Sequence, residues 1–149
     1  AKAMGIHTAL DTNGYYGERL TDAELDTIDL VLLDVKSCGP ELHLRLTGMD
    51  LGPTQQFARR LAARQRPVWI RFVLVPGLTD APGHIEQIAE VAAGLGNVRR
   101  VDVLPFHQMG RYKWQRLGLE YTLDHVDPPP PDAVEQACAV FRAAGLKAY

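Results

Sequence analysis

The chain has 149 residues, of which 46% are hydrophobic and 23% are charged, which is the length and composition of a single globular domain over residues 1–149. Its formal net charge of −2 gives no reason to expect nucleic acid or an acidic membrane surface as a partner. No apolar run is long enough to span a bilayer and no signal-peptide pattern occurs, so we expect a cytoplasmic protein.

Apolar periodicity and turn residues predict strands that alternate with helices. Residues 1–5 are typical of a last helical turn closed by glycine, so we expect a chain truncated at its amino terminus. The predicted strands are 6–10, 30–36, 68–75, 98–104 and 146–149. The predicted helices are a short one capped at 21, then 41–46, 53–65, 80–95 and 131–144, with an irregular segment between 107 and 131. This order predicts an α/β fold with a parallel sheet and right-handed crossovers.

The central feature is the stretch Leu30–Lys36, in which the four apolar residues 30–33 are followed by Asp34-Val35-Lys36. A continuous apolar run is typical of a strand buried on both faces of a parallel sheet. Side chains alternate along a strand, so Asp34 and Lys36 share a face at its carboxyl end, where α/β folds bind ligands. Two interpretations stay open: the two charges form a ligand site, or they pair with each other or with loop residues.

Further polar residues are expected at the same rim. Asp11 follows the first predicted strand and His107 follows the fourth, so both converge with Asp34 and Lys36 if the strands are parallel. His107 is also compatible with a loop histidine whose hydrogen bonds are satisfied. Arg71 is the one charge in strand 68–75 and needs an anionic partner, which is either protein or ligand.

Two cysteines occur, Cys38 and Cys138, and they are far apart. They build neither a disulfide framework nor a cysteine-based metal site. The helical spacing places Cys138 on an apolar face, in the core, and Cys38 beside Gly39-Pro40 is interpreted as a loop thiol.

Four motifs in register carry a resemblance over essentially the whole chain. They are Asp11-Thr12-Asn13-Gly14, Leu33-Asp34-Val35-Lys36, Val68–Phe72 with Val75-Pro76-Gly77, and Leu104-Pro105-Phe106-His107 with Gly110 and Lys113-Trp114. In this order they resemble pyruvate formate-lyase-activating enzymes, which are radical S-adenosylmethionine proteins. The resemblance implies a partial, TIM-like (β/α) barrel, of which this chain is the carboxyl-terminal portion.

The resemblance also implies an activity. Proteins of that family bind a [4Fe-4S] cluster and S-adenosylmethionine, cleave the latter reductively to a 5′-deoxyadenosyl radical, and abstract hydrogen from a glycine of pyruvate formate-lyase or a related glycyl radical enzyme. A flavodoxin or ferredoxin type protein donates the electron. Carried over to this sequence, the roles are S-adenosylmethionine contacts by Asp34, Val35, Lys36 and His107, a monovalent-cation site at Asp11, Thr12 and Asp34, and a substrate-cavity position at Arg71.

One departure from the family pattern is large. The family's Cys-x3-Cys-x2-Cys motif and its glycine-rich segment are both absent, so no cluster ligands exist in this chain. We therefore expect a fragment that is inactive alone and that leaves an unpaired strand edge. The alternative is a non-redox, metal-dependent β/α lyase or hydrolase, or a small-ligand binding module, in which Asp11, Asp34 and His107 hold a divalent ion.

Overall fold

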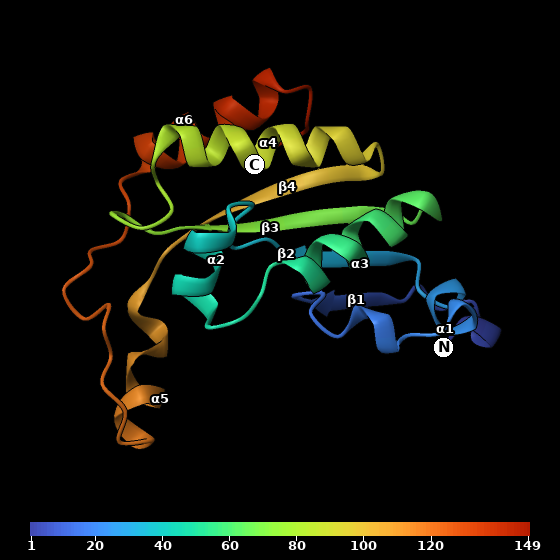
Figure 1. Ribbon diagram of the computed structural model, residues 1–149, viewed down its shortest axis with the longest axis horizontal. Coiled ribbons are helices and arrows are strands. Elements are labelled where there is room, and N and C mark those ends of the chain that lie inside the picture. The colour runs from blue at the N-terminus through green and yellow to red at the C-terminus, as the bar shows by residue number, and fades with distance from the viewer.

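A parallel sheet of four strands forms the centre of the protein. The computed structural model describes residues 1–149, and its strands lie in the order β1-β2-β3-β4, each paired in parallel with the next (Figure 1). Their bounds are β1 Ala9–Thr12, β2 Leu30–Asp34, β3 Val68–Leu74 and β4 Val98–Pro105. The predicted α/β class with a parallel sheet is therefore confirmed.

Six α-helices connect and follow the strands. They are α1 Asp22–Asp26, α2 Pro40–Thr47, α3 Gly52–Ala63, α4 Pro82–Leu95, α5 Arg111–Arg116 and α6 Pro131–Ala143, with 3-10 turns at Lys2–Met4, Gly17–Arg19 and Gln108–Gly110. Thr21 and Glu24 form the predicted capping box at the start of α1. Gly48 ends α2 with a φ of 70°, a left-handed conformation that a residue with a Cβ rarely adopts. None of these helices combines the length and hydropathy that a membrane crossing requires.

The two faces of the sheet have different environments. Alternate strand residues such as Val31, Ile70 and Val101 are buried in one core with apolar side chains of α3, α4 and α6. The strand residues between them are only partly buried, and they include Asp34, Arg71 and other polar side chains. Figure 1 shows α4 and α6 stacked along one side of β3 and β4. The polar residues of the strands therefore share the face opposite the helix layer, which we call the open face.

The first strand begins later than the sequence predicts. Asp29 accepts a hydrogen bond from the Thr8 backbone N–H at 2.8 Å and donates its own N–H to the Thr8 carbonyl at 3.0 Å, so ladder pairing starts only at Ala9 with Leu30. The predicted strand over residues 6–10 is corrected to Ala9–Thr12. Asp11 consequently lies inside the strand and not in a turn after it.

The carboxyl-terminal residues form a single bridge and not a fifth strand. Ala148 pairs in parallel with Val101, and the Val101 and Val103 N–H groups donate to the carbonyls of Lys147 and Tyr149 at 2.8 and 2.9 Å. The segment thus lies beside β4 in the predicted direction, but it is too short to extend the ladder. At the other side of the sheet, β1 pairs only with β2, so its outer edge is free.

The segment between β4 and α6 is more regular than expected. It contains the 3-10 turn Gln108–Gly110 and the helix α5, which stands away from the rest of the molecule (Figure 1). The expectation that no element occurs here was wrong, because the helix is only six residues long and buries no residue, so it shows no apolar stripe in the sequence.

Candidate functional site

The two charges of the Asp34-Val35-Lys36 stretch lie against each other. Asp34 is the last residue of β2, and the Lys36 Nζ donates to its Oδ2 at 3.0 Å. Both side chains keep about a third of their surface exposed, 27% for Asp34 and 36% for Lys36. The pairing interpretation is therefore correct for the free protein, and it leaves the ammonium accessible to a competing carboxylate.

Arg71 finds its anionic partners within the protein. Its Nη1 donates to Asp11 Oδ2 at 2.6 Å, and its Nε lies 3.9 Å from Asp34 Oδ1. Asp34 and Arg71 are neighbours in the β2–β3 register, whereas Asp11 reaches Arg71 from two strands away, across β2. The result is a charge chain on the open face, Asp11–Arg71–Asp34–Lys36, in which each group contacts one of opposite sign. We call these four residues the charge chain.

A cavity of about 160 Å³ opens beside Asp34 and Lys36. Its other walls come from the loop after β1, from α2 and its following turn, and from α3; they are Asn13, Tyr15, Tyr16, His43, Thr47, Met49 and Thr54. Ligand pockets usually measure about 300–1,000 Å³, so this cavity accommodates only part of a nucleoside-sized molecule. The remainder of such a ligand would lie outside it.

His43 is the residue of this cavity that the sequence did not single out. It is 5% exposed, its Nδ1 has no hydrogen-bond partner, and burial lowers its pKa below the ordinary value. A neutral, buried imidazole with a free ring nitrogen is well suited to exchange a hydrogen bond with a ligand. In the sequence, His43 could have been found from its place on the predicted helix directly after the Asp34-Val35-Lys36 stretch.

His107 lies apart from the charge chain. It is exposed, and its Nδ1 accepts the Met109 N–H at 3.3 Å, so it caps the 3-10 turn that follows β4. Lys36 follows β2 and His107 follows β4, and β3 lies between these two strands. Two strand spacings of about 4.8 Å each therefore separate the strands that the two residues follow. Both residues lie at the carboxyl edge, as predicted, but only an extended ligand can contact both.

The residues assigned to a cation do not present three side chains to one point. Asp11 is occupied by Arg71, and Thr12 points to the opposite face of β1, where its Oγ1 accepts the Gly14 N–H at 3.0 Å. The whole chain contains no group of three or more His, Cys, Asp and Glu side chains arranged to hold a metal ion. The alternative site of Asp11, Asp34 and His107 for a divalent ion is thus not assembled.

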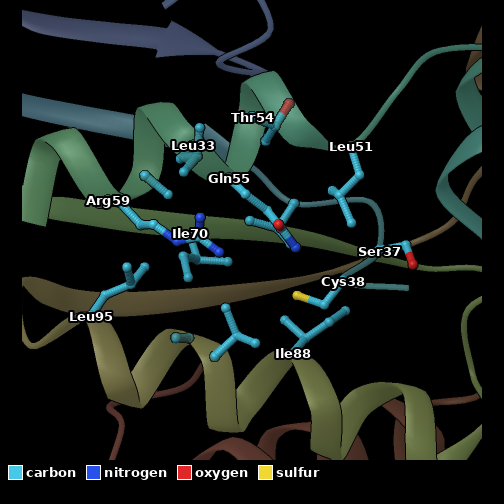
Figure 2. Close-up of a pocket in the computed structure, with 14 residues that line it drawn as sticks. Leu33, Ser37, Cys38, Leu51, Thr54, Gln55, Arg59, Ile70, Ile88 and Leu95 are labelled. Atoms are coloured by element: carbon cyan, nitrogen blue, oxygen red, sulfur yellow. The ribbon is translucent and has the colours of Figure 1, made fainter. Parts of the chain in front are cut away.

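A second cavity, of about 110 Å³, lies on the other side of the sheet between α3 and α4. Figure 2 shows Leu33 and Ile70 from the strands, and Ile88 and Leu95 from α4, around this space. Val35 also lines it, so Val35 faces away from Asp34 and Lys36, as strand alternation predicts. The cavity is mostly apolar and is separate from the charge chain.

The cysteines do not fit an iron–sulfur cluster. Cys138 is 2% exposed in the core on α6, whereas Cys38 lies in the loop after β2 at the rim of the apolar cavity (Figure 2). Burial raises the pKa of the Cys38 thiol to about 11, so it stays protonated at neutral pH. A cluster needs several thiolates at one place, and this chain does not supply them.

Comparisons with known proteins agree with the motifs. The chain is 38% identical over 148 residues to the pyruvate formate-lyase 1-activating enzyme of Escherichia coli K12, an alignment that includes 98% of this chain and 60% of that protein. It is 38% identical over 153 residues to the pyruvate formate-lyase-activating enzyme of Listeria monocytogenes, again over 98% of this chain and 61% of the relative. No protein-family model matches the sequence.

Solved structures confirm the fold. A domain of a pyruvate-formate lyase-activating enzyme from Bacteroides vulgatus superposes with a TM-score of 0.80 at 24% identity, over 99% of this chain and 83% of that one. A radical SAM methyltransferase from Sphaerobacter thermophilus gives a TM-score of 0.70 at 16% identity, over 98% of this chain and 41% of the other. Over almost its whole length the chain is thus similar to the pyruvate formate-lyase-activating enzymes, as its motifs indicated, and it spans about 60% of the length of these relatives.

Proposed function

We propose that this chain is the carboxyl-terminal portion of a radical S-adenosylmethionine enzyme that activates a glycyl radical enzyme such as pyruvate formate-lyase. The observation that carries the proposal is the accessible Lys36–Asp34 pair beside a cavity at the carboxyl edge of a parallel sheet, in a chain similar to such activases over 98% of its length. Reductive cleavage of S-adenosylmethionine, hydrogen abstraction from a partner glycine, and electron supply by a flavodoxin or ferredoxin are then activities of the whole protein.

The donor set at this edge fits S-adenosylmethionine. The ligand has a carboxylate, an ammonium group and ribose hydroxyls, which match the Lys36 ammonium, the Asp34 carboxylate and the free ring nitrogen of His43. When the ligand's carboxylate approaches Lys36, the Asp34 oxygens become available to the ligand's own donors. Arg71 holds Asp34 and Asp11 in place during this exchange, since it contacts both. The side chains of Asp11, Thr12 and Asp34 do not meet at one point, so the proposal includes no cation site formed by them.

This chain supplies binding groups and not the redox centre. Its two cysteines are not positioned to hold a cluster, so the cluster ligands must come from elsewhere in the full-length protein. We therefore assign no electron-transfer step to residues 1–149. We also expect that these residues alone do not activate a partner.

The test is the affinity of the full-length protein for S-adenosylmethionine, measured by isothermal titration calorimetry. A charge-assisted hydrogen bond contributes about 1.5–3 kcal/mol, so Lys36→Ala should weaken the affinity about 10- to 100-fold. Lys36→Arg, which keeps the charge, should lose less. Lys147→Ala removes the same charge at an exposed position and is the control.

Two results would contradict the proposal. An affinity that is the same for Lys36→Ala and Lys147→Ala would remove Lys36 from the site. In the second experiment, the reduced full-length protein is incubated with S-adenosylmethionine and pyruvate formate-lyase, and the glycyl radical is measured by electron paramagnetic resonance. Absence of a radical signal would contradict the activase function for that partner.

A further inference from the structure

His84 is a half-buried histidine that has no role in the function proposed above. It lies in the first turn of α4, and its imidazole packs against the ring of Phe72 with the centroids 6.0 Å apart. Phe72 is fully buried in the core, so it gives the imidazole a fixed support. The Nε2 of His84 is buried and has no hydrogen-bond partner, and a buried polar atom without a partner calls for an explanation.

The polar neighbour of the His84 imidazole is the main chain of Lys36. The backbone hydrogen bonds of β2 with β3 end at Val35, whose N–H donates to the Arg71 carbonyl at 3.0 Å, and no backbone N–H donates to the Lys36 carbonyl. Burial lowers the pKa of His84, and a hydrogen-bonding interaction with the Lys36 main chain partly offsets this effect. An interaction that raises the pKa of a histidine identifies the ring as the donor and the carbonyl as the acceptor. A neutral ring has one N–H to donate, which explains why its other nitrogen has no partner.

The residues after Lys36 are also held in place. Ser37 is 1% exposed, and its Oγ accepts the Gly39 N–H and donates to the Gly39 carbonyl, both at 3.0 Å. A Cβ built on Gly39 would lie 3.6 Å from Gln87 Oε1, so α4 also approaches this loop about one turn after His84. The chain is therefore fixed by the sheet before Lys36 and by its own turn after it, whereas the Lys36 peptide group depends on a side chain of α4.

The charged groups around His84 do not compete for its imidazole. A cavity of about 480 Å³ beside the ring is lined by Glu41 and Arg45 of α2 and by Asp80 from the loop before α4. Asp80 accepts the Gly77 N–H at 2.9 Å, and no charged side chain contributes to the pKa of His84. The ring is thus available to the Lys36 carbonyl alone.

We propose that His84 is a positioning residue for S-adenosylmethionine binding: its imidazole holds the main-chain carbonyl of Lys36 and so fixes the point from which the Lys36 ammonium reaches the carboxylate of the ligand. With this peptide group fixed, only the side chain of Lys36 loses freedom when the ligand binds, which lowers the entropic cost of binding. His84 acts from the helix side of the sheet, whereas the ammonium lies on the open face beside Asp34. The inference rests on the function proposed above, which supplies the ligand of Lys36.

The experiment measures the S-adenosylmethionine affinity of the full-length protein by isothermal titration calorimetry at pH 8, where the ring is neutral. His84→Leu keeps an apolar side chain against Phe72 but removes the donor, and it should weaken the affinity about 3- to 10-fold, as expected for the loss of one hydrogen bond. His84→Asn and His84→Gln carry amide donors at the reach of the two ring nitrogens, and the better of them should restore the affinity to within about twofold of the unmodified protein. Phe141→Leu is the control for lost packing, because Phe141 of α6 contacts the same Phe72 ring with the centroids 5.9 Å apart, and it should leave the affinity within about twofold.

A double mutant separates positioning of Lys36 from a general loss of structure. If His84 acts through Lys36, adding His84→Leu to Lys36→Ala should weaken the affinity further by less than about twofold.

Three results would overturn the positioning role and leave the function proposed above intact, provided that Lys36→Ala alone still weakens the affinity. They are an affinity of His84→Leu equal to that of Phe141→Leu, a loss in both amide variants as large as in His84→Leu, and the same fold-loss from His84→Leu with and without Lys36→Ala. If Lys36→Ala instead binds S-adenosylmethionine as tightly as Lys147→Ala, the role of Lys36 in the function proposed above fails, and the positioning role of His84 fails with it.

Discussion

Replacing Arg71 with methionine tests the charge chain directly. Methionine keeps a flexible apolar stem of similar reach but removes the guanidinium that contacts Asp11 at 2.6 Å and lies 3.9 Å from Asp34. The charge chain then holds two carboxylates, Asp11 and Asp34, and one cation, Lys36. We expect the free energy of unfolding to fall.

The expected loss follows from the exposure of the charges. Two unit charges 4 Å apart attract by about 1 kcal/mol in water and about 4 kcal/mol at the effective dielectric of a protein surface. Asp11 is 58% exposed, so its pair with Arg71 is near the lower value, whereas Arg71 and Asp34 expose only 32% and 27%. Since ordering long side chains offsets part of each attraction, we expect a total loss of about 1–2 kcal/mol.

The assay is equilibrium urea denaturation of the full-length protein at low and at high salt. Arg99→Met is the matched control, because Arg99 is an exposed strand arginine without an ion pair. The cost of Arg71→Met should exceed the cost of the control and should shrink in 1 M NaCl, where the Debye length is about 3 Å. Combining Arg71→Met with Asp11→Asn should give a coupling energy of about 0.5–1 kcal/mol.

Equal losses for Arg71→Met and Arg99→Met would refute this reasoning. So would a cost that does not depend on salt, since it would attribute the loss to packing of the stem and not to charge.

Two other predictions concern the packing of the fold. A Cβ at Gly17 would overlap the ring of the buried Phe57, so Gly17→Ala should destabilise the protein by about 1–3 kcal/mol. In the control Gly83→Ala, in α4, the added Cβ meets no atom, so this variant should be neutral or stabilising. Equal free energies of unfolding for the two variants in urea denaturation would contradict the close contact at Gly17. Burial lowers the folded-state pKa of His43 below its ordinary value of 6.5, so the unfolded chain binds the additional proton first and stability should decrease as the pH falls below about 6.5. Melting temperatures between pH 8 and pH 5 should show this decrease, and His43→Gln should reduce it. A pH profile that His43→Gln leaves unchanged would contradict the lowered pKa of His43.

Local sequence patterns were sufficient for most of the secondary structure. The apolar run before Asp34, the capping box at Thr21 and Glu24, and the glycine that ends α2 all act within a few residues, so each can be recognised without knowing the rest of the chain. The alternation of strands and helices then predicts a parallel sheet, because parallel neighbours need a crossover between them. Only elements without a strong local pattern, such as the six-residue α5, were missed.

The tertiary structure alone decided how the candidate residues combine. Asp11 and Arg71 are 60 positions apart in sequence, and their contact depends on the register of β1, β2 and β3, which backbone hydrogen bonds set jointly across the sheet. The same applies to His43, whose place beside Lys36 depends on how α2 packs. Periodicity determines which face a side chain occupies, because it is a property of one element. Which charges pair on that face is a property of several elements packed together.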